Sequence, residues 1–128
     1  MPCVSAVVGL KGLASMVVGP TDTAIAMGSG AVPVLATPRL VALCEEATCA
    51  ALHGHLADGC TTVGMRVQLD HLQPTAVGGT VEAEAMLERI EGRRLTFMVS
   101  ASDGMGLVAA GKVTRVLVDV AQFLAKTH

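Results

Sequence analysis

Three side chains in this mostly apolar chain have the types needed for acid-base or nucleophilic chemistry: Thr37, Glu45 and His71. A glutamate on an apolar helix could act as a general base or attack directly as a nucleophile. His71 follows Asp70 and could relay a proton near neutral pH or orient the Thr37 hydroxyl. A backbone N–H near Gly64 or at a helix start could face a developing oxyanion, because glycine allows close approach. Together these groups could cleave an activated carbonyl.

Each residue also has a purely structural interpretation. Thr37 could simply cap a helix, and Glu45 could belong to a solvated surface pair with Glu46. His71 could be an ordinary hydrogen-bonded residue at a strand end, and Gly64 could mark a β-bulge. Residue types alone do not decide between the two interpretations.

The elements that must position these residues are predicted from the hydrophobic pattern. Period-two alternation over residues 79–103 predicts two strands joined by a turn at Gly92. One helix is predicted from Pro38 to about Leu56, with Thr37 as its N-cap and Gly59 at its exit, while residues 19–30 are expected to form a turn or loop. Further strands are predicted at residues 4–10, 10–18, 61–72 and 107–120.

This order predicts an α+β fold in a single domain spanning residues 1–128. The four strands after the helix are expected to form a meander, so the sheet would be antiparallel with about five strands. Because the long helix is so apolar, it must be wrapped rather than laid on a surface. The sheet is therefore expected to curl around a central helix, as in the hotdog fold, which usually pairs two copies edge to edge.

Several short motifs resemble the fluoroacetyl-CoA thioesterase family of hotdog enzymes. The resemblance covers about residues 34–115 and rests on these motifs: Ala36-Thr37-Pro38, Glu45-Glu46-Ala47, Thr61-Thr62-Val63-Gly64, His71-Leu72 with Pro74-Thr75, and Glu91-Gly92-Arg93-Arg94-Leu95 with Val99, Ala101, Asp103 and Gly104. It implies a catalytic set of Thr37, Glu45 and His71. A glycine near the reacting carbonyl and an arginine on the last strand would be Gly64 and Arg115.

The remaining assignments concern the substrate. Arg93 and Arg94 could reach a CoA phosphate or could form a solvated turn, and Arg115 could instead be an ion-pair partner. The family's namesake carries aromatic residues before its threonine, but residues 28–36 have none, so a small or medium acyl group is expected. A histidine common in the last strand of relatives corresponds to Val113.

The spacing of the proposed catalytic residues raises a geometric question. Eight positions on a straight helix separate Thr37 from Glu45 by about 12 Å along the axis and about 80° around it. Either the regular helix begins after Thr37 and the preceding loop folds back, or the site is completed across a dimer interface. The sequence leaves both arrangements open.

Composition limits the remaining function classes. The chain is 52% hydrophobic and 16% charged, with a net charge of -2 and two phenylalanines as its aromatic residues, which argues against a nucleic-acid partner. No apolar run approaches the roughly 20 residues of a membrane span, so no membrane partner is expected, and cysteines without a secretory context favour the cytoplasm. So much apolar surface with so little charge predicts a homodimer, with a tetramer as the larger alternative.

The cysteines and histidines suggest no metal centre. Cys3, Cys44, Cys49 and Cys60 are expected to be reduced and buried. The cluster His53, His55, Asp58 and Cys60 matches no standard zinc pattern, so neither a metal nor any other cofactor is expected apart from the CoA of the substrate.

The leading hypothesis is acyl-CoA hydrolysis, and the alternatives are an acyl-CoA binding or sensing protein and an enoyl-CoA hydratase that uses Asp70 and His71.

Overall fold

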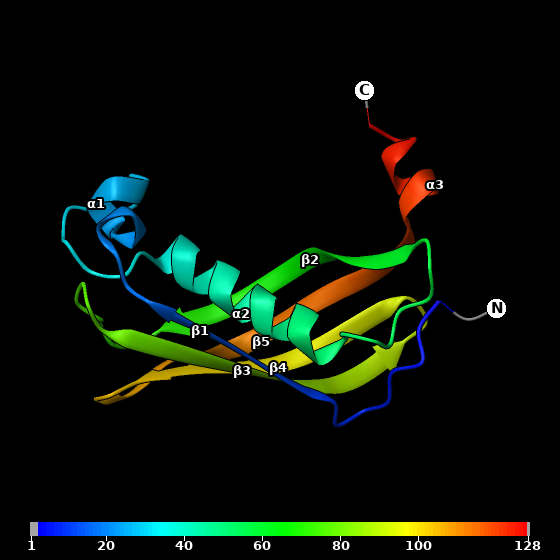
Figure 1. The fold of residues 1–128 in the computed structure, drawn as a ribbon, viewed down its shortest axis with the longest axis horizontal. Coiled ribbons are helices and arrows are strands. Elements are labelled where there is room, and N and C mark those ends of the chain that lie inside the picture. Colours follow the sequence, from blue (N-terminus) through cyan, green and yellow to red (C-terminus); the bar gives the residue numbers. More distant parts are fainter. Residues whose placement is uncertain (1–2, 128) are drawn as a thin grey trace.

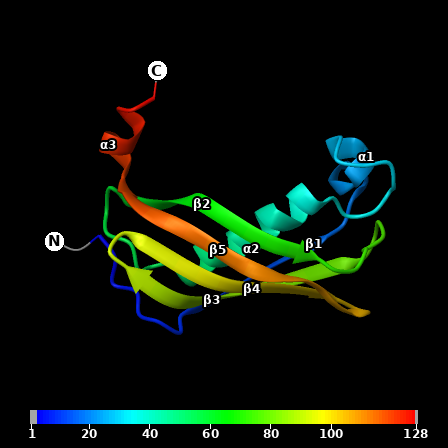
Figure 2. The same cartoon turned by 180° about the vertical axis from the view of Figure 1, so that it is seen from behind.

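A five-stranded antiparallel sheet curls around one central helix in the computed structural model, which describes residues 3–127. The strands are β1 (Lys11–Val17), β2 (Cys60–His71), β3 (Thr80–Glu91), β4 (Arg94–Asp103) and β5 (Gly106–Asp119). The helices are η1 (Pro20–Asp22), α1 (Ala24–Met27), α2 (Thr37–Ala51) and α3 (Val120–Leu124). Helix α2 crosses one face of the sheet, and the view from behind shows the strands covering it (Figures 1 and 2). This is the predicted α+β hotdog arrangement.

The core forms where α2 faces the sheet. Inward residues of β3 and β4 alternate with exposed ones, as the period-two pattern predicts. The inward-facing residues of α2 recur every three or four positions and are buried. The main buried residues are Leu40, Leu43, Ala47, Val81, Ala83, Ala85, Leu87, Leu95 and Phe97. This contact fixes α2, and therefore its polar side chains, relative to β2 and β5.

The predicted meander is wrong for β2. The strand order is β1-β3-β4-β5-β2, so β2 pairs with β5 at the far edge of the sheet and not with β3. The reason is that β1 already pairs with the edge of β3 that β2 would need. The predicted strand at residues 4–10 is also wrong, because these residues form an isolated bridge between Val4 and Leu56 and a few separate backbone hydrogen bonds in place of a regular strand.

Helix boundaries differ from the prediction at both ends. Helix α2 ends at Ala51 because the chain turns through Leu52 toward Gly54, whose φ of 80° does not continue a right-handed helix. At the other end Ala36 is the N-cap residue, so Thr37 is already helical and does not cap the helix. Residues 19–30, predicted as loop, contain η1 and α1, and the short α3 was not predicted.

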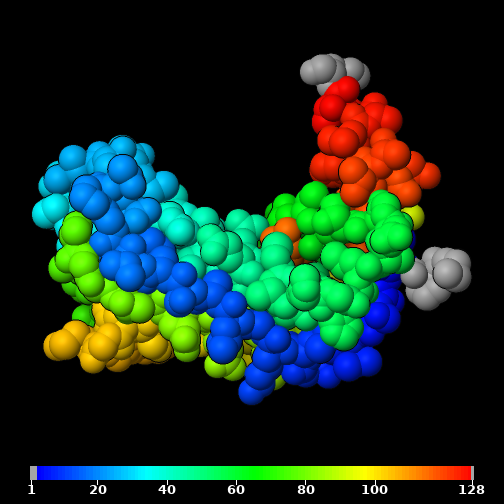
Figure 3. Space-filling model, in the orientation of Figure 1, coloured from blue at the N-terminus to red at the C-terminus, as the bar shows by residue number. Residues whose placement is uncertain are grey.

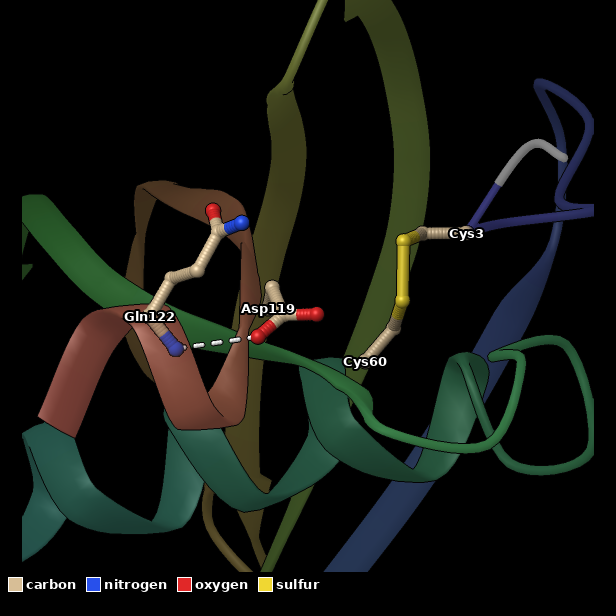
Figure 4. Close-up of a disulfide and its surroundings, with 4 residues drawn as sticks. All are labelled: Cys3, Cys60, Asp119 and Gln122. Carbon is tan, nitrogen blue, oxygen red and sulfur yellow. Dashed lines mark hydrogen bonds between the residues drawn. A yellow bond between two sulfur atoms is a disulfide. The ribbon is translucent and has the colours of Figure 1, made fainter. Parts of the chain in front are cut away.

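The cysteine prediction is partly wrong, because Cys3 and Cys60 form a disulfide (Figure 4). Backbone pairing brings them together: the Ala57 N–H donates to the Cys3 carbonyl at 2.8 Å. Composition could not reveal this long-range contact between the N-terminal segment and the start of β2. Of the other two, Cys44 is buried as predicted, whereas Cys49 is exposed.

The C-terminal segment begins beside this disulfide. Asp119 pairs with Cys60 at the end of the β2–β5 ladder, and its Oδ1 accepts the Gln122 N–H at 2.9 Å, which starts α3 (Figure 4). Helix α3 then projects away from the body of the fold (Figure 1). Within residues 3–127, no helix is both long and apolar enough to cross a membrane.

A carboxylate fastens the segment after β2 to the β4–β5 hairpin. The buried Thr75 hydroxyl donates to Asp103 Oδ2 at 2.7 Å, and the Met105 N–H donates to Oδ1 at 2.8 Å. The hydrogen bond from Thr75, followed by that from Met105, lowers the pKa of Asp103. A lowered pKa means that the stabilisation is present above the ordinary aspartate pKa and is lost as pH falls through the folded-state value.

We therefore expect Asp103→Asn to lower the melting temperature at pH 7 by roughly 3 °C, because the charge-assisted hydrogen bonds are weakened. Thermal unfolding at pH 7 and at pH 3 measures the effect. The difference between wild type and variant should be smaller at pH 3, because that pH lies below the ordinary aspartate pKa of 3.8 and the stabilisation is lost progressively from there downward. An equal difference at both pH values would contradict this interpretation.

Candidate active site

Thr37 and His71 are brought together although they are 34 positions apart in the chain. Thr37 Oγ1 lies 2.8 Å from His71 Nδ1, in a hydrogen bond whose direction depends on the imidazole tautomer. Thr37 is the first residue of α2 and His71 the last of β2. Their backbones are aligned by the preceding and following segments, since the Leu35 N–H donates to the Thr75 carbonyl at 2.8 Å. The hydroxyl that was predicted to cap the helix instead faces the imidazole.

The other imidazole nitrogen of His71 is conspicuous. His71 Nε2 is buried and has no hydrogen-bond partner within residues 3–127. Leaving such a buried polar atom unsatisfied costs about 1–3 kcal/mol, so a histidine there is poorly explained by fold stability alone. A pocket of about 220 Å³ adjoins the ring and is lined by Val34, His71, Leu72, Gln73 and Pro74. The environment leaves room for a small polar or acyl group beside the imidazole.

Glu45 belongs to a second cluster, further along α2. Its Oε2 accepts a hydrogen bond from Arg115 Nη1 at 3.2 Å, with side-chain exposures of 34% for the carboxylate and 8% for the guanidinium. Within the described chain, Glu45 Oε1 has no side-chain partner. Arg115 was predicted as a substrate contact, but three of its N–H groups already serve Glu45 and Thr62. The ion pair fixes Oε2 of the carboxylate, whereas Oε1 can accept a proton or contact a substrate.

Gly64 lies directly against this carboxylate. The β2–β5 register shifts between Gly64 and Arg66, so the structural interpretation of a bulge applies here. A Cβ added at Gly64 would collide with Glu45 Oε2 and would lie 3.8 Å from Arg115 Nη1. Glycine at this position is therefore required for the carboxylate to occupy its place against the strand.

The structure excludes one of the two arrangements that could bring Thr37 and Glu45 together. Thr37 and Glu45 both lie within the regular helix α2, which excludes a loop that folds back on the helix start. Eight helical positions separate them by about 12 Å along the axis. One protomer therefore presents two clusters, Thr37 with His71 and Glu45 with Arg115 and Gly64. A broad concavity runs between the α1 segment and α3, with α2 and β2 on its floor (Figure 3).

Arg93, Arg94 and Cys44 complete the set of side chains considered from the sequence. Arg93 and Arg94 are exposed at the β3–β4 turn, which fits both a solvated turn and a contact with a CoA phosphate. Burial, followed by the charge of Glu45, raises the pKa of Cys44 to about 11, so this thiol stays protonated near neutral pH. No group of three or more metal-ligating side chains occurs within residues 3–127.

Thr62 is the residue of the site that sequence reasoning did not single out. It is 7% exposed, and both its hydroxyl and its carbonyl accept hydrogen bonds from Arg115. Thr62 stands two positions before Gly64 and therefore on the same face of β2. This spacing is the sequence feature that could have placed Thr62 in the site.

Comparisons of sequence and of structure relate this chain to known thioesterases. The fluoroacetyl-CoA thioesterase of Streptantibioticus cattleyicolor is 36% identical over 95 residues, which are 74% of this chain and 68% of that protein. A crystal structure of the fluoroacetyl-CoA-specific thioesterase, in a variant complexed with fluoroacetate and CoA, matches with a TM-score of 0.86 and 31% identity, covering 92% of this chain and 99% of that one. A Thermus thermophilus member of the thioesterase superfamily matches with a TM-score of 0.86 and 27% identity over 97% and 90% of the two chains.

The family itself is identified by its sequence profile. The profile of the fluoroacetyl-CoA-specific thioesterases matches residues 18–121, which include both clusters on α2. The predicted resemblance is thereby confirmed over a longer range than the motifs covered. The chain belongs to the fluoroacetyl-CoA-specific thioesterase family, a family of thioester hydrolases.

Proposed function

We propose that this chain hydrolyses a small or medium acyl-CoA to the free acid and CoA, in a homodimer whose two protomers share each site. Glu45 of one protomer would act together with Thr37 and His71 of the second. The observation that carries this proposal is the contact at 2.8 Å between Thr37 Oγ1 and His71 Nδ1, which pairs a hydroxyl with a group able to accept its proton. The separation of about 12 Å along α2 is the reason for placing Glu45 across the interface.

The chemistry divides between the two clusters. With Nδ1 unprotonated, the imidazole accepts the Thr37 O–H and orients the hydroxyl toward the thioester. Glu45, held by Arg115 through Oε2, uses Oε1 either to take a proton from water or to attack the carbonyl itself. In both routes the carbon–sulfur bond breaks and the CoA thiolate departs and takes up a proton. In the general-base route, water supplies the second carboxylate oxygen of the acid directly; in the nucleophilic route, Glu45 forms a mixed anhydride with the acyl group, and water then hydrolyses that anhydride. Trapping of an acylated Glu45 by mass spectrometry, or oxygen-18 incorporation into Glu45 during turnover in labelled water, would identify the nucleophilic route.

The acyl preference is inferred from what surrounds the Thr37 hydroxyl. Residues 28–36 contain glycine, serine, alanine, valine, leucine and proline but no aromatic ring. The pocket beside His71 has about 220 Å³ of space with apolar walls at Val34, Leu72 and Pro74. These features support acceptance of acyl groups larger than the fluoroacetyl group of the relative.

An acyl-CoA panel tests the reaction. Acetyl-, fluoroacetyl-, butyryl-, hexanoyl- and octanoyl-CoA are offered to the protein, and thiol release is followed with a chromogenic thiol reagent. Background from the protein comes mainly from the exposed Cys49, since Cys44 is buried. Thiol release from at least one substrate is expected. Tight binding of every acyl-CoA without thiol release would indicate a binding protein. Crotonyl-CoA is assayed alongside the panel, and loss of its enoyl absorbance without thiol release would indicate a hydratase.

Mixed dimers test the shared site. Glu45→Gln and His71→Ala are produced separately, each inactive, and then mixed under conditions that exchange subunits. If the site is shared, half of the dimers are mixed and each of these has one intact site, so activity should return to about one quarter of wild type. If both clusters of one protomer serve the same site, mixing restores nothing. A monomer in size-exclusion chromatography at micromolar concentration would also reject this arrangement.

A further inference from the structure

We propose that Thr62 is a positioning residue that sets the orientation of the Glu45 carboxylate through Arg115. This inference rests on the proposed hydrolytic function, and it assigns a role to a residue outside the Thr37, Glu45 and His71 set. Its basis is a continuous chain of hydrogen bonds from β2 through β5 to α2.

Thr62 accepts two hydrogen bonds from the guanidinium of Arg115. Arg115 Nε donates to Thr62 Oγ1 at 2.8 Å, and Nη2 donates to the Thr62 carbonyl at 3.0 Å. Two bonds to one residue fix the plane of a rigid fork, whereas one bond would leave it free to rotate. The third nitrogen, Nη1, then donates to Glu45 Oε2 at 3.2 Å.

Burial makes this restraint strong. Thr62 and Arg115 are each 7% exposed, so water cannot readily replace the threonine hydroxyl as an acceptor. A guanidinium in such surroundings keeps its N–H groups satisfied or moves until they are. If the threonine hydroxyl is removed, Arg115 is expected to turn toward other acceptors and away from the carboxylate.

Glu45 depends on this restraint more than a typical surface carboxylate would. Gly64 leaves space for Oε2 against β2, and Arg115 Nη1 is its one charged partner within the described chain. When Arg115 turns, the carboxylate can swing out of its place on Gly64. Catalytic groups need to be held within about 0.5 Å of their productive geometry, so this motion should slow the chemical step.

The test compares Thr62→Val with Thr62→Ser. Valine keeps the β-branched shape but has no acceptor, while serine keeps the hydroxyl. We expect the valine variant to lower kcat roughly tenfold, as for one lost hydrogen bond to a charged group, with KM changed much less because Thr62 does not reach the substrate. The serine variant should keep near wild-type kcat. Thr114→Val, one residue before Arg115 on β5 with no hydrogen bond from its side chain within the described chain, is the matched control and should behave as wild type.

A second readout separates this inference from the proposed function. Crystal structures of the two Thr62 variants should show Arg115 turned away from Glu45 in the valine variant and still bonded to it in the serine variant. If the valine variant does not fold, Thr62→Ala is used in its place. Wild-type kcat in the valine variant, or equal defects in valine and serine variants, would overturn the positioning role. An inactive wild type would count against the proposed function, and the crystal structures would still decide whether Thr62 holds the ion pair.

Discussion

Replacing Glu45 by glutamine is expected to reduce kcat by about 10³-fold, because the amide can neither take a proton from water nor attack a carbonyl. The side chain keeps its length, and its amide oxygen can still accept from Arg115 Nη1 in place of the carboxylate. The fold should therefore persist. The measurement is thiol release from the best acyl-CoA of the panel, alongside a thermal unfolding curve.

Glu46→Gln is the matched control for this variant. Glu46 is the next residue of α2, but its side chain is 55% exposed and faces Arg39 at 3.5 Å, away from the Arg115 cluster. A weak ion pair of this kind contributes about 0–1 kcal/mol, so the control should retain both activity and stability. If both variants lose activity equally, or if neither does, Glu45 has no special role in the reaction.

Replacing Gly12 by alanine is expected to destabilise the fold strongly. A Cβ at Gly12 would collide with the backbone of α2, at the Ala51 nitrogen and the Ala47 carbonyl oxygen. A helix backbone cannot move aside as a flexible side chain can, so β1 or α2 must shift. We expect a loss of about 3 kcal/mol, or roughly 10 °C in melting temperature.

Thermal unfolding of Gly12→Ala beside Gly104→Ala checks this prediction. Gly104 lies in the β4–β5 hairpin, where an added Cβ meets nothing within 4 Å. Its replacement should change the melting temperature by no more than about 2 °C. Similar melting temperatures for the two variants would mean that β1 does not pack against α2 as closely as the structure describes.

Much of the fold was predictable because periodicity and turn chemistry are local. The alternation in β3 and β4 and the turn at Gly92, with a φ of 61°, could be read directly from the chain. The place of β2 beside β5 could not, because it depends on which sheet edge remains open after β1 pairs with β3. The disulfide between Cys3 and Cys60 was missed for the same reason, since it joins segments 57 positions apart.

The site shows the same division between local and long-range information. Family motifs brought Thr37, Glu45 and His71 to attention, and the contact between Thr37 and His71 is present in the structure. The partner of Arg115 could not be predicted, because its contacts with Thr62 and Glu45 join positions 53 and 70 residues away. The mixed-dimer experiment decides whether Glu45 meets the other two residues.

Backbone pairing joins the segment before α2 to the segment after β2, and it holds Thr37 and His71 in place independently of the loop that precedes them. Val34 bridges Ala76, and Leu35 bonds Thr75, so the hydroxyl and the imidazole are carried on two directly linked strands of backbone. The stretch at residues 28–33 lies outside this linkage and is exposed. Its length and side chains could therefore change to suit a different substrate without altering the separation of the proton-sharing pair.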